Sequence, residues 1–283
     1  MSRIALLIPV YNEIEGLYAA LYPLINSEGN FDVIVVDDGS EQDIDVNKQQ
    51  FPFPIMLHRH DKNLGIACAL NTGLQYILSR NYEYVARLDT WDICEPDRLV
   101  KQALFLDENL DHAMVGCDVD FFDCNGHHLY RYGPKLSYKD ILNEMHHRPS
   151  FIHPAIMVRT NAFRTLGLYK NSYPGGEDYE FFFRLTRSYK AANLDEILLH
   201  VFLNPHGISL SQRNQLIRTR FRLQFENFSY CNPHCYLGII RTSLLATAPY
   251  MLIYALKRLL RPATEKHSKP SFMPEQKSDF GEQ

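Results

Sequence analysis

The first half of the chain alternates apolar runs of strand length with amphipathic segments of helical length. The apolar runs predict strands at residues 4–10, 31–36, 55–59 and 82–88. The amphipathic segments predict helices at residues 13–25, 66–79 and 96–109. Runs that are apolar on both faces are typical of strands covered by helices on both sides. The repeated strand–helix order therefore indicates an α/β fold with a mostly parallel sheet and helices on both faces.

The pattern becomes less regular after about residue 112. Apolar runs there predict strands at residues 114–122, 155–158 and 197–203. Helical periodicity predicts helices at residues 138–145, 160–166, 177–188 and 212–228. The segment 125–138 is rich in Gly, His and Tyr, and we expect it to be irregular. A boundary near residue 112 thus divides the chain into two halves of different pattern.

The most apolar long stretch lies near the C-terminus, at residues 236–260, and is interrupted by Arg241, Pro249 and Lys257. Its uninterrupted part, about fifteen residues, is shorter than the roughly twenty needed to span a bilayer. Basic residues follow it directly, which favours helices lying on an anionic membrane surface. A helix pair that covers the rest of the protein, or forms a homodimer, is an equally weighted alternative. The polar tail, residues 263–283, is expected to be disordered.

Composition restricts the possible functions. The chain has 283 residues, of which 46% are apolar and 22% charged, as expected for a folded protein. The formal net charge of −4 gives no indication of nucleic-acid binding. None of the six cysteines forms a CxxC pair, and the N-terminal residues lack a signal-peptide pattern. These features predict a cytoplasmic protein with reduced thiols, which could be peripheral on the inner face of the cell membrane.

Polar residues follow three of the predicted strands at the point where each strand ends. The segments are PVYNE at residues 9–13, DDGS at 37–40 and DTWD at 89–92. Ligands of open parallel sheets bind at the carboxyl ends of the strands, so the three segments are expected to converge on one crevice. An Asp or Ser at a strand end can also be a simple helix cap, and for Asp38 and Ser40 the two readings are equally weighted.

The ordered set of motifs resembles the family 2 glycosyltransferases of the GT-A fold. The set consists of IPVYNE at residues 8–13, VVDDGS at 35–40, NLGIACALNTGL at 63–74, ARLDTWD at 86–92 and GGEDYEFFFRL at 175–185. Each motif is weak alone, but their order and spacing match over roughly residues 3–210. The resemblance implies a GT-A (Rossmann-like) fold, with C-terminal helices added here. It also implies transfer of a sugar from a nucleotide-sugar donor, with inversion at the anomeric carbon.

The resemblance and the residue types give a set of candidate donor-binding residues. A nucleotide needs a slot with apolar walls and a few hydrogen-bond acceptors. Exposed amides at the start of a helix can face phosphate or ribose, although residues 63–65 can equally be a simple helix start. The expected nucleotide-sugar-binding residues are Pro9, Tyr11, Glu13, Asp38, Asn63, Gly65, Arg87, Asp89 and Trp91.

Trp91, the only tryptophan, stands where members of the family often carry a metal-binding carboxylate. Asp89 and Asp92 remain on either side of it. A divalent cation bound to a diphosphate needs oxygen ligands, often only one or two from the protein. We therefore expect a divalent metal, Mn²⁺ or Mg²⁺, with Asp92, Asp89 and His206 as its candidate ligands. The Trp91 indole could stack on a sugar ring, or it could simply pack against the protein.

A second acidic motif, Gly175-Gly176-Glu177-Asp178, opens the predicted helix at residues 177–188. An acceptor hydroxyl that attacks the sugar must lose a proton to a base. The resemblance assigns that role to Asp178, with Glu177 supporting it or contacting the acceptor. The alternative is a helix start that carries favourable negative charge.

The sequence therefore predicts an inverting glycosyltransferase acting on a glycan or lipid-linked acceptor, in cell-envelope polysaccharide or lipopolysaccharide synthesis. One alternative is a catalytically weakened homologue acting as a binding or scaffold subunit, which Trp91 motivates. A nucleotidyltransferase is disfavoured, because the N-terminal motif is not a glycine- and lysine-rich triphosphate loop. The expected division is 1–112 for the nucleotide-sugar half, 113–228 for the acceptor and catalytic-base half, 229–262 for the apolar helices and 263–283 for the tail.

Overall fold

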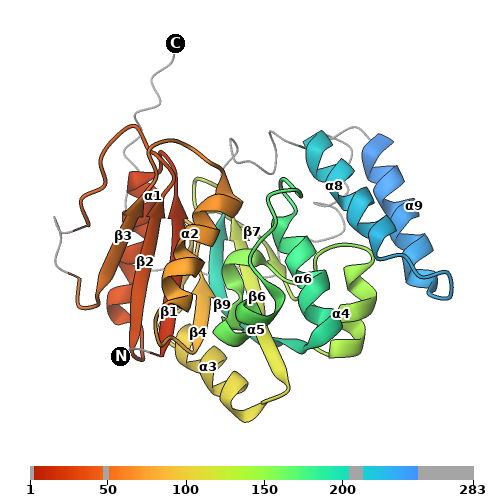
Figure 1. Cartoon of the computed structure of the whole chain (residues 1–283), viewed down its shortest axis with the longest axis horizontal. Helices are drawn as coiled ribbons and strands as arrows, with labels where there is room; N and C mark the ends of the chain where they lie inside the picture. Colours follow the sequence, from red (N-terminus) through yellow and green to blue (C-terminus); the bar gives the residue numbers. More distant parts are fainter. Residues whose placement is uncertain (1–2, 47–50, 204–212, 248–283) are drawn as a thin grey trace.

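The computed structural model describes residues 3–46, 51–203 and 213–247 (Figure 1). Its centre is a nine-stranded sheet with the order β3-β2-β1-β4-β8-β6-β9-β5, and β7 pairs with β6 beside this path. The strands are β1 (Ile4–Val10), β2 (Phe31–Asp37), β3 (Ile55–Arg59), β4 (Tyr84–Arg87), β5 (Ile93–Cys94), β6 (His112–Phe122), β7 (His128–Tyr132), β8 (Met157–Arg159) and β9 (Lys190–Phe202).

The N-terminal half of the sheet is parallel, as predicted. β1 pairs in parallel with both β2 and β4, and β2 pairs in parallel with β3. β8 enters the sheet antiparallel to β4 and β6, whereas β6 and β9 run parallel to each other. The expected mostly parallel α/β sheet is confirmed, with antiparallel pairings confined to the second half and the edge.

Helices cover both faces of this sheet. They are α1 (Ile14–Leu21), α2 (Ile66–Leu78), α3 (Arg98–Glu108), α4 (Tyr138–Met145), α5 (Thr160–Leu166), α6 (Glu177–Ser188), α8 (Arg213–Glu226) and α9 (Pro233–Thr247), with short 3-10 turns η1 (Pro23–Asn26) and η3 (His153–Ala155). Alternate residues of β1 divide between the two faces. Leu6 and Ile8 pack in the core that contains Leu17 of α1, whereas Leu7 packs in the core that contains Leu74 of α2. This alternation explains why β1 is apolar throughout.

Several predicted boundaries and one predicted loop are wrong. The first helix ends at Leu21, because Pro23 cannot donate the next helical hydrogen bond and a 3-10 turn follows. The segment expected to be irregular contains β7, whose residues Tyr130 and Arg131 pair with β6. The last strand begins at Lys190 rather than near residue 197, since its first residues pair with β6.

The two C-terminal helices, α8 and α9, pack against each other at the side of the molecule opposite β3 (Figure 1). Over the described part of the chain, no helix combines the length and apolarity that crossing a bilayer requires. The expected tail at residues 263–283 and most of the apolar stretch beyond α9 lie outside the described residues.

Candidate active site

The ends of β1 and β2 are joined by a short network of hydrogen bonds. The Asp38 amide donates to the Val10 carbonyl at 2.8 Å, and the Asn12 amide donates to Ser40 Oγ at 2.8 Å. The Asn12 side chain in turn accepts from the Glu41 amide at 2.9 Å. Asn12 has a φ of 52°, a left-handed conformation that Asn tolerates better than most residues. The first two polar segments therefore form one edge, as predicted.

Asp38 organises the loop that precedes α2. Its two carboxylate oxygens accept from the amides of Leu64 at 2.9 Å and Gly65 at 2.7 Å. His60 Nδ1 lies 2.7 Å from Asp38 Oδ1, and His60 Nε2 is held by Thr72 at 2.8 Å. The structure thus brings Asp38 and Gly65 together, with His60 as a supporting residue that the sequence did not reveal.

The other residues of this edge differ in their exposure. Tyr11 is exposed, whereas Pro9 is buried within β1. The Asn63 side chain accepts from the Gly65 amide at 3.0 Å, which makes it a local cap. Among these residues, only Tyr11 offers an exposed aromatic ring.

Trp91 connects the turn after β4 to the first helix. It has a φ of 69°, and its backbone amide donates to the Gly16 carbonyl at 2.9 Å. Its indole Nε1 donates to Glu13 Oε2 at 2.6 Å. A Cβ on Gly16 would lie only 2.4 Å from that same nitrogen, so the ring covers the helix backbone. The packing interpretation of Trp91 is therefore supported, and stacking on a sugar stays a prediction.

Arg87 and Asp89 form a pair at the end of β4. The buried Arg87 guanidinium donates to Asp89 Oδ1 at 2.6 Å and to the Leu7 carbonyl at 3.2 Å. The Asp89 side chain is 43% exposed, so it can reach a ligand while remaining anchored. A fixed guanidinium behind an accessible carboxylate orients that carboxylate.

Asp92 lies behind this pair. It is 2% exposed, and its Oδ1 accepts from the Phe202 amide at 3.4 Å. Burial, and then the negative charge of Asp89, raise the pKa of Asp92 well above its usual range. Asp92 Oδ2 has no hydrogen-bond partner among the residues that the structure describes.

Asp89 and Asp92 can supply a divalent cation with two protein ligands, but not with three. Within residues 3–46, 51–203 and 213–247, no group of three or more His, Cys, Asp or Glu side chains could hold a metal ion. Asp89 offers an accessible oxygen, and Asp92 offers a buried oxygen without a partner. A cation between them would relieve their mutual repulsion. The third expected ligand, His206, lies outside the described residues.

The second acidic motif stands at the start of α6, beneath α8. Gly175 has a φ of 67°, a conformation that favours glycine. A Cβ there would lie 2.5 Å from Leu216 Cδ2, and a Cβ on Gly176 would lie 2.6 Å from Thr219 Cγ2. The pair of glycines therefore allows α8 to cover the loop that presents Glu177 and Asp178.

The environment of the two carboxylates suits one of them to act as a base. Burial, and then the charge of Glu177, raise the pKa of Asp178 to about 7. Burial also raises the pKa of Glu177, although its own amide and those of Gly176 and Gly175 oppose this. A carboxylate with a pKa near 7 is a stronger base than an ordinary aspartate, and about half of it is still ionised at neutral pH.

Arg87 connects this motif to the end of β4. Its positive charge lowers the pKa of Glu177 and of Asp178, in each case less than burial raises it. The same charge acts on His153, which burial keeps neutral and whose Nε2 lies 2.9 Å from the Tyr169 hydroxyl. The charge of the guanidinium bound to Asp89 therefore also acts on the start of α6, which relates the candidate donor residues to the candidate base.

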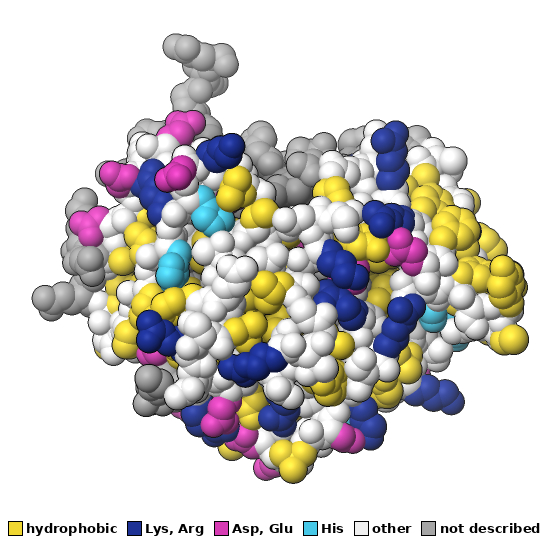
Figure 2. All heavy atoms as spheres, in the orientation of Figure 1, with side chains coloured by type: hydrophobic (Ala, Val, Ile, Leu, Met, Phe, Trp, Pro, Cys, Tyr) yellow, Lys and Arg dark blue, Asp and Glu magenta, His cyan; other side chains and the backbone are white. Residues whose placement is uncertain are grey.

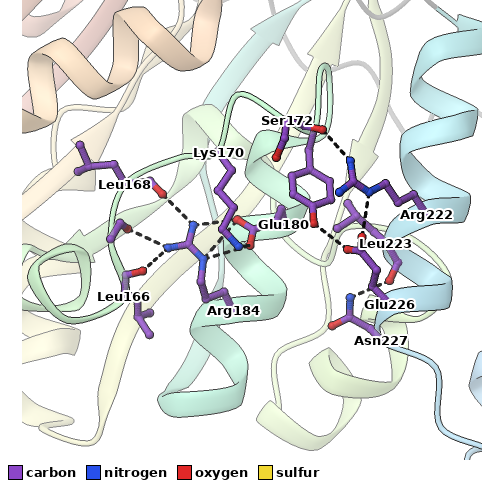
Figure 3. A network of polar contacts seen from close by, with 12 residues as sticks. Leu166, Leu168, Lys170, Ser172, Glu180, Arg184, Arg222, Leu223, Glu226 and Asn227 are labelled. Atoms are coloured by element: carbon purple, nitrogen blue, oxygen red, sulfur yellow. Dashed lines mark hydrogen bonds and ion pairs between the residues drawn. The ribbon is translucent and has the colours of Figure 1, made fainter.

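The loop between α5 and α6 is held from two sides (Figure 3). Arg184 of α6 donates to the carbonyls of Leu166 and Leu168, and it pairs with Glu180 at 2.8 Å. Arg222 of α8 donates to the Ser172 carbonyl at 2.9 Å and pairs with Glu226 at 2.8 Å. This bracing fixes the backbone that leads into Gly175.

The fold and the placement of these carboxylates are those expected of a glycosyltransferase, and comparison with known proteins gives the same class. The model of the Glycosyl transferase family 2 matches residues 5–167. The chain belongs to this family and is a glycosyltransferase.

Relatives of the chain include other glycosyltransferases. The chain is 26% identical over 208 residues to the amylovoran biosynthesis glycosyltransferase AmsE of Erwinia amylovora, covering 73% of both chains. It is 28% identical over 207 residues to the putative glycosyltransferase EpsE of Bacillus subtilis, covering 70% of this chain and 72% of EpsE.

Solved structures confirm the GT-A fold at low sequence identity. S. aureus TarS 1–349 in complex with UDP-GlcNAc matches with a TM-score of 0.61 and 18% identity, covering 82% of this chain and 69% of TarS. The mannosyltransferase PcManGT of Pyrobaculum calidifontis, in complex with GDP-Man and Mn²⁺, matches with a TM-score of 0.60 and 15% identity, covering 92% of this chain and 80% of PcManGT.

Proposed function

We propose that this protein is an inverting glycosyltransferase that transfers a sugar from a nucleotide-sugar donor to a glycan or lipid-linked acceptor in cell-surface polysaccharide assembly. The observation that carries the proposal is the position of Arg87. It binds Asp89 directly and also acts on the charges of Glu177 and Asp178. The buried Arg87 guanidinium thus interacts both with the accessible carboxylate of Asp89 and with the charge of the candidate base, Asp178.

Each group has a defined task in this reaction. Asp38 holds the loop at Gly65, and the exposed Tyr11 ring can then receive the nucleotide. Asp89, held by Arg87, accepts from sugar or ribose hydroxyls. Asp178 removes the proton of the acceptor hydroxyl as that oxygen attacks the anomeric carbon from the face opposite the leaving nucleotide. Attack from the opposite face by a single displacement inverts the configuration at that carbon.

Asp89 and Asp92 are the residues that would hold a divalent cation, Mn²⁺ or Mg²⁺. When bound, such a cation neutralises charge on the donor diphosphate and stabilises it as a leaving group. The support comes from these two side chains. Asp89 is accessible, and Asp92 is buried with one oxygen that has no hydrogen-bond partner among the described residues.

The surface of α9 supports contact with an anionic membrane. Leu237, Ile240 and Leu244 are 52%, 56% and 64% exposed, and their spacing places them along one side of the helix. Figure 2 shows hydrophobic side chains gathered at the edge of the molecule where α9 lies. Ile240→Ser should weaken cosedimentation with phosphatidylglycerol vesicles. Loss of dimers in light scattering without a change in vesicle binding would instead identify this face as a contact between copies.

A screen of nucleotide sugars tests the proposed activity. A bound donor raises the melting temperature by mass action, so UDP- and GDP-sugars are compared with and without Mn²⁺. The stabilising donor is then used in a transfer assay with wild-type protein and Asp178→Asn. Donor binding by both proteins, with transfer and an inverted product only for wild type, is expected. Binding of no nucleotide sugar, or equal turnover by the two, would contradict the proposal.

A further inference from the structure

Three arginines from separate segments meet beside α6. Arg148 follows α4, Arg220 belongs to α8 and Arg241 belongs to α9. Arg148 and Arg220 are half-buried, and Arg241 is exposed. The grouping is not a local feature of the sequence, because only the packing of α8 and α9 against α4 produces it.

The contacts of α8 direct Arg220 toward the end of α4. Gln224 lies one helical turn after Arg220, and its Nε2 donates to the His146 carbonyl at 2.9 Å. Residues four apart share a face of a helix. Arg220 therefore points to the segment that contains His146 and, two residues later, Arg148.

The contacts of α9 direct Arg241 to the same place. Gly238 precedes Arg241 by three residues and rests directly on the His146 carbonyl, since a Cβ at position 238 would lie 1.9 Å from that oxygen. The two helices thus meet the same carbonyl group. Their arginines stand one turn away from it, and the charge of Arg148 acts on both.

The positive charge of this cluster is only partly compensated. Arg148 pairs with Glu144 at 2.6 Å and lies over the Tyr132 ring at 4.8 Å. Across the residues that the structure describes, no hydrogen bond or ion pair holds the guanidinium of Arg220 or Arg241. Burial lowers the pKa of Arg220. Two carboxylates, Glu144 and Asp178, thus act on three guanidinium groups.

This arrangement differs from the other arginines nearby. Arg184 and Arg222 are each held by a carboxylate and by backbone carbonyls (Figure 3). Their hydrogen-bonding capacity is used within the protein. The N–H groups of Arg220 and Arg241, by contrast, are available to donate hydrogen bonds to a ligand.

The cluster also lies next to the candidate base. Thr219, adjacent to Arg220, packs so closely on Gly176 that a Cβ there would lie 2.6 Å from Thr219 Cγ2. The negative charge of Asp178 acts on Arg220 in turn. An anion bound by the arginines would therefore sit beside the carboxylate that deprotonates the acceptor.

We propose that Arg148, Arg220 and Arg241 form a subsite for a phosphate or diphosphate group carried by the acceptor. Guanidinium groups bind phosphate through paired, charge-assisted hydrogen bonds. The donor-binding edge, at the ends of β1 and β2, lies on the other side of the molecule from α4, α8 and α9 (Figure 1). The inference rests on the proposed function and specifies the chemical class of its acceptor.

Binding of soluble probes tests the subsite without any need for turnover. The full chain is titrated calorimetrically with inorganic pyrophosphate, geranyl diphosphate and geraniol, in the presence of saturating UDP or GDP, whichever binds. Wild-type protein should bind inorganic pyrophosphate and geranyl diphosphate, but it should not bind geraniol. Arg220→Gln and Arg241→Gln should each weaken phosphate binding about tenfold or more, which is the loss of one charge-assisted contact.

The matched control is Arg218→Gln, an exposed arginine on the same helix, which should bind as wild type does. Arg220→Lys retains the charge and should keep most of the affinity, even if Arg220→Gln does not fold. Equal phosphate affinity of Arg220→Gln and Arg218→Gln would overturn the proposal. Weaker UDP or GDP binding by Arg220→Gln would assign the cluster to the donor. Weaker binding to phosphatidylglycerol vesicles alone would assign it to lipid headgroups, and either result would also overturn the proposal.

Discussion

Trp91 donates its indole N–H to the carboxylate of Glu13 at 2.6 Å, across 78 positions of sequence. The ring also lies on Gly16, so the turn after β4 and the start of α1 form one unit. In the family pattern this position often carries a metal-binding carboxylate. Here it joins two loops of the candidate donor site, and the acidic function is left to Asp89 and Asp92.

Removing the acceptor of this hydrogen bond should loosen the junction. Glu13→Ala leaves the half-buried indole N–H without a partner, which should lower the free energy of unfolding by about 1–3 kcal/mol. Glu13→Gln keeps an acceptor oxygen and should lower it less. Urea unfolding followed by fluorescence checks this directly, because Trp91 is the only tryptophan. Equal stability of the two variants would show that the hydrogen bond does not hold the junction.

The effect of Mn²⁺ on nucleotide binding should depend on Asp89 more than on any other nearby carboxylate. Asp89→Asn removes the accessible charge, so the strengthening of nucleoside diphosphate binding by Mn²⁺ should fall about tenfold or more. Calorimetric titrations with and without Mn²⁺ measure this effect. Asp97→Asn, which changes a carboxylate paired with Lys101, is the control and should leave the effect intact. Nucleotide binding that Mn²⁺ never alters would remove the metal from the reaction.

The sequence predicted the donor side of the fold well, because that side is built from local signals. Apolar runs marked β1, β2 and β3, and polar strand ends marked the loops that hold Asp38. Packing was one of the two roles that the sequence suggested for Trp91, but its partners could not be predicted, since Gly16 lies in another element. His60 was missed for the same reason, because its bonds to Asp38 and Thr72 form only in the folded chain.

The acceptor side was less predictable, because its features arise from tertiary packing. His146 and His147 are half-buried against α9, which nothing in the sequence around them indicates. His147 Nε2 lies 3.0 Å from His234 Nδ1, and Cys235 Sγ lies 3.3 Å from His146 Nδ1. No periodicity within α4 indicates these contacts, which exist only because α9 returns to this site.

The fit between Gly176 and Thr219 should control how α8 covers the base. Gly176→Ala places a methyl group 2.6 Å from Thr219 Cγ2, which should displace α8 and lower the transfer rate. Thr219→Ser removes that methyl group but keeps the hydroxyl that donates to the Pro174 carbonyl at 3.0 Å. The double variant should recover much of the lost rate, and a double-mutant cycle on kcat measures the recovery. Additive losses would show that the contact does not position α8.

The transfer rate should follow the ionisation of Asp178. Its pKa is raised to about 7, and a base acts only when deprotonated, so kcat/KM should rise with pH and level off above that value. Asp178→Asn should lower kcat by about 10²–10⁴-fold and remove this acid limb. Initial rates between pH 5 and 9 give the profile. An acid limb that persists in Asp178→Asn would assign the titration to another group.

The ionisation of Asp178 should also change the free energy of unfolding. This free energy should fall as the pH rises, whereas the transfer rate should rise. The folded protein binds the Asp178 proton more tightly than the unfolded chain, because burial raises the folded pKa from 3.8 to about 7. The resulting contribution to stability is fully present below pH 3.8 and is lost as the pH rises through about 7. Asp178→Asn carries no charge at any pH, so its melting temperature should exceed that of wild type most clearly at pH 8. The advantage should shrink toward pH 5, where Asp178 is protonated in the folded protein. Melting curves of wild type and Asp178→Asn from pH 5 to 8 measure this difference. Asp97→Asn, which changes a carboxylate on the surface, is the control. A difference in melting temperature that is constant with pH would contradict this account.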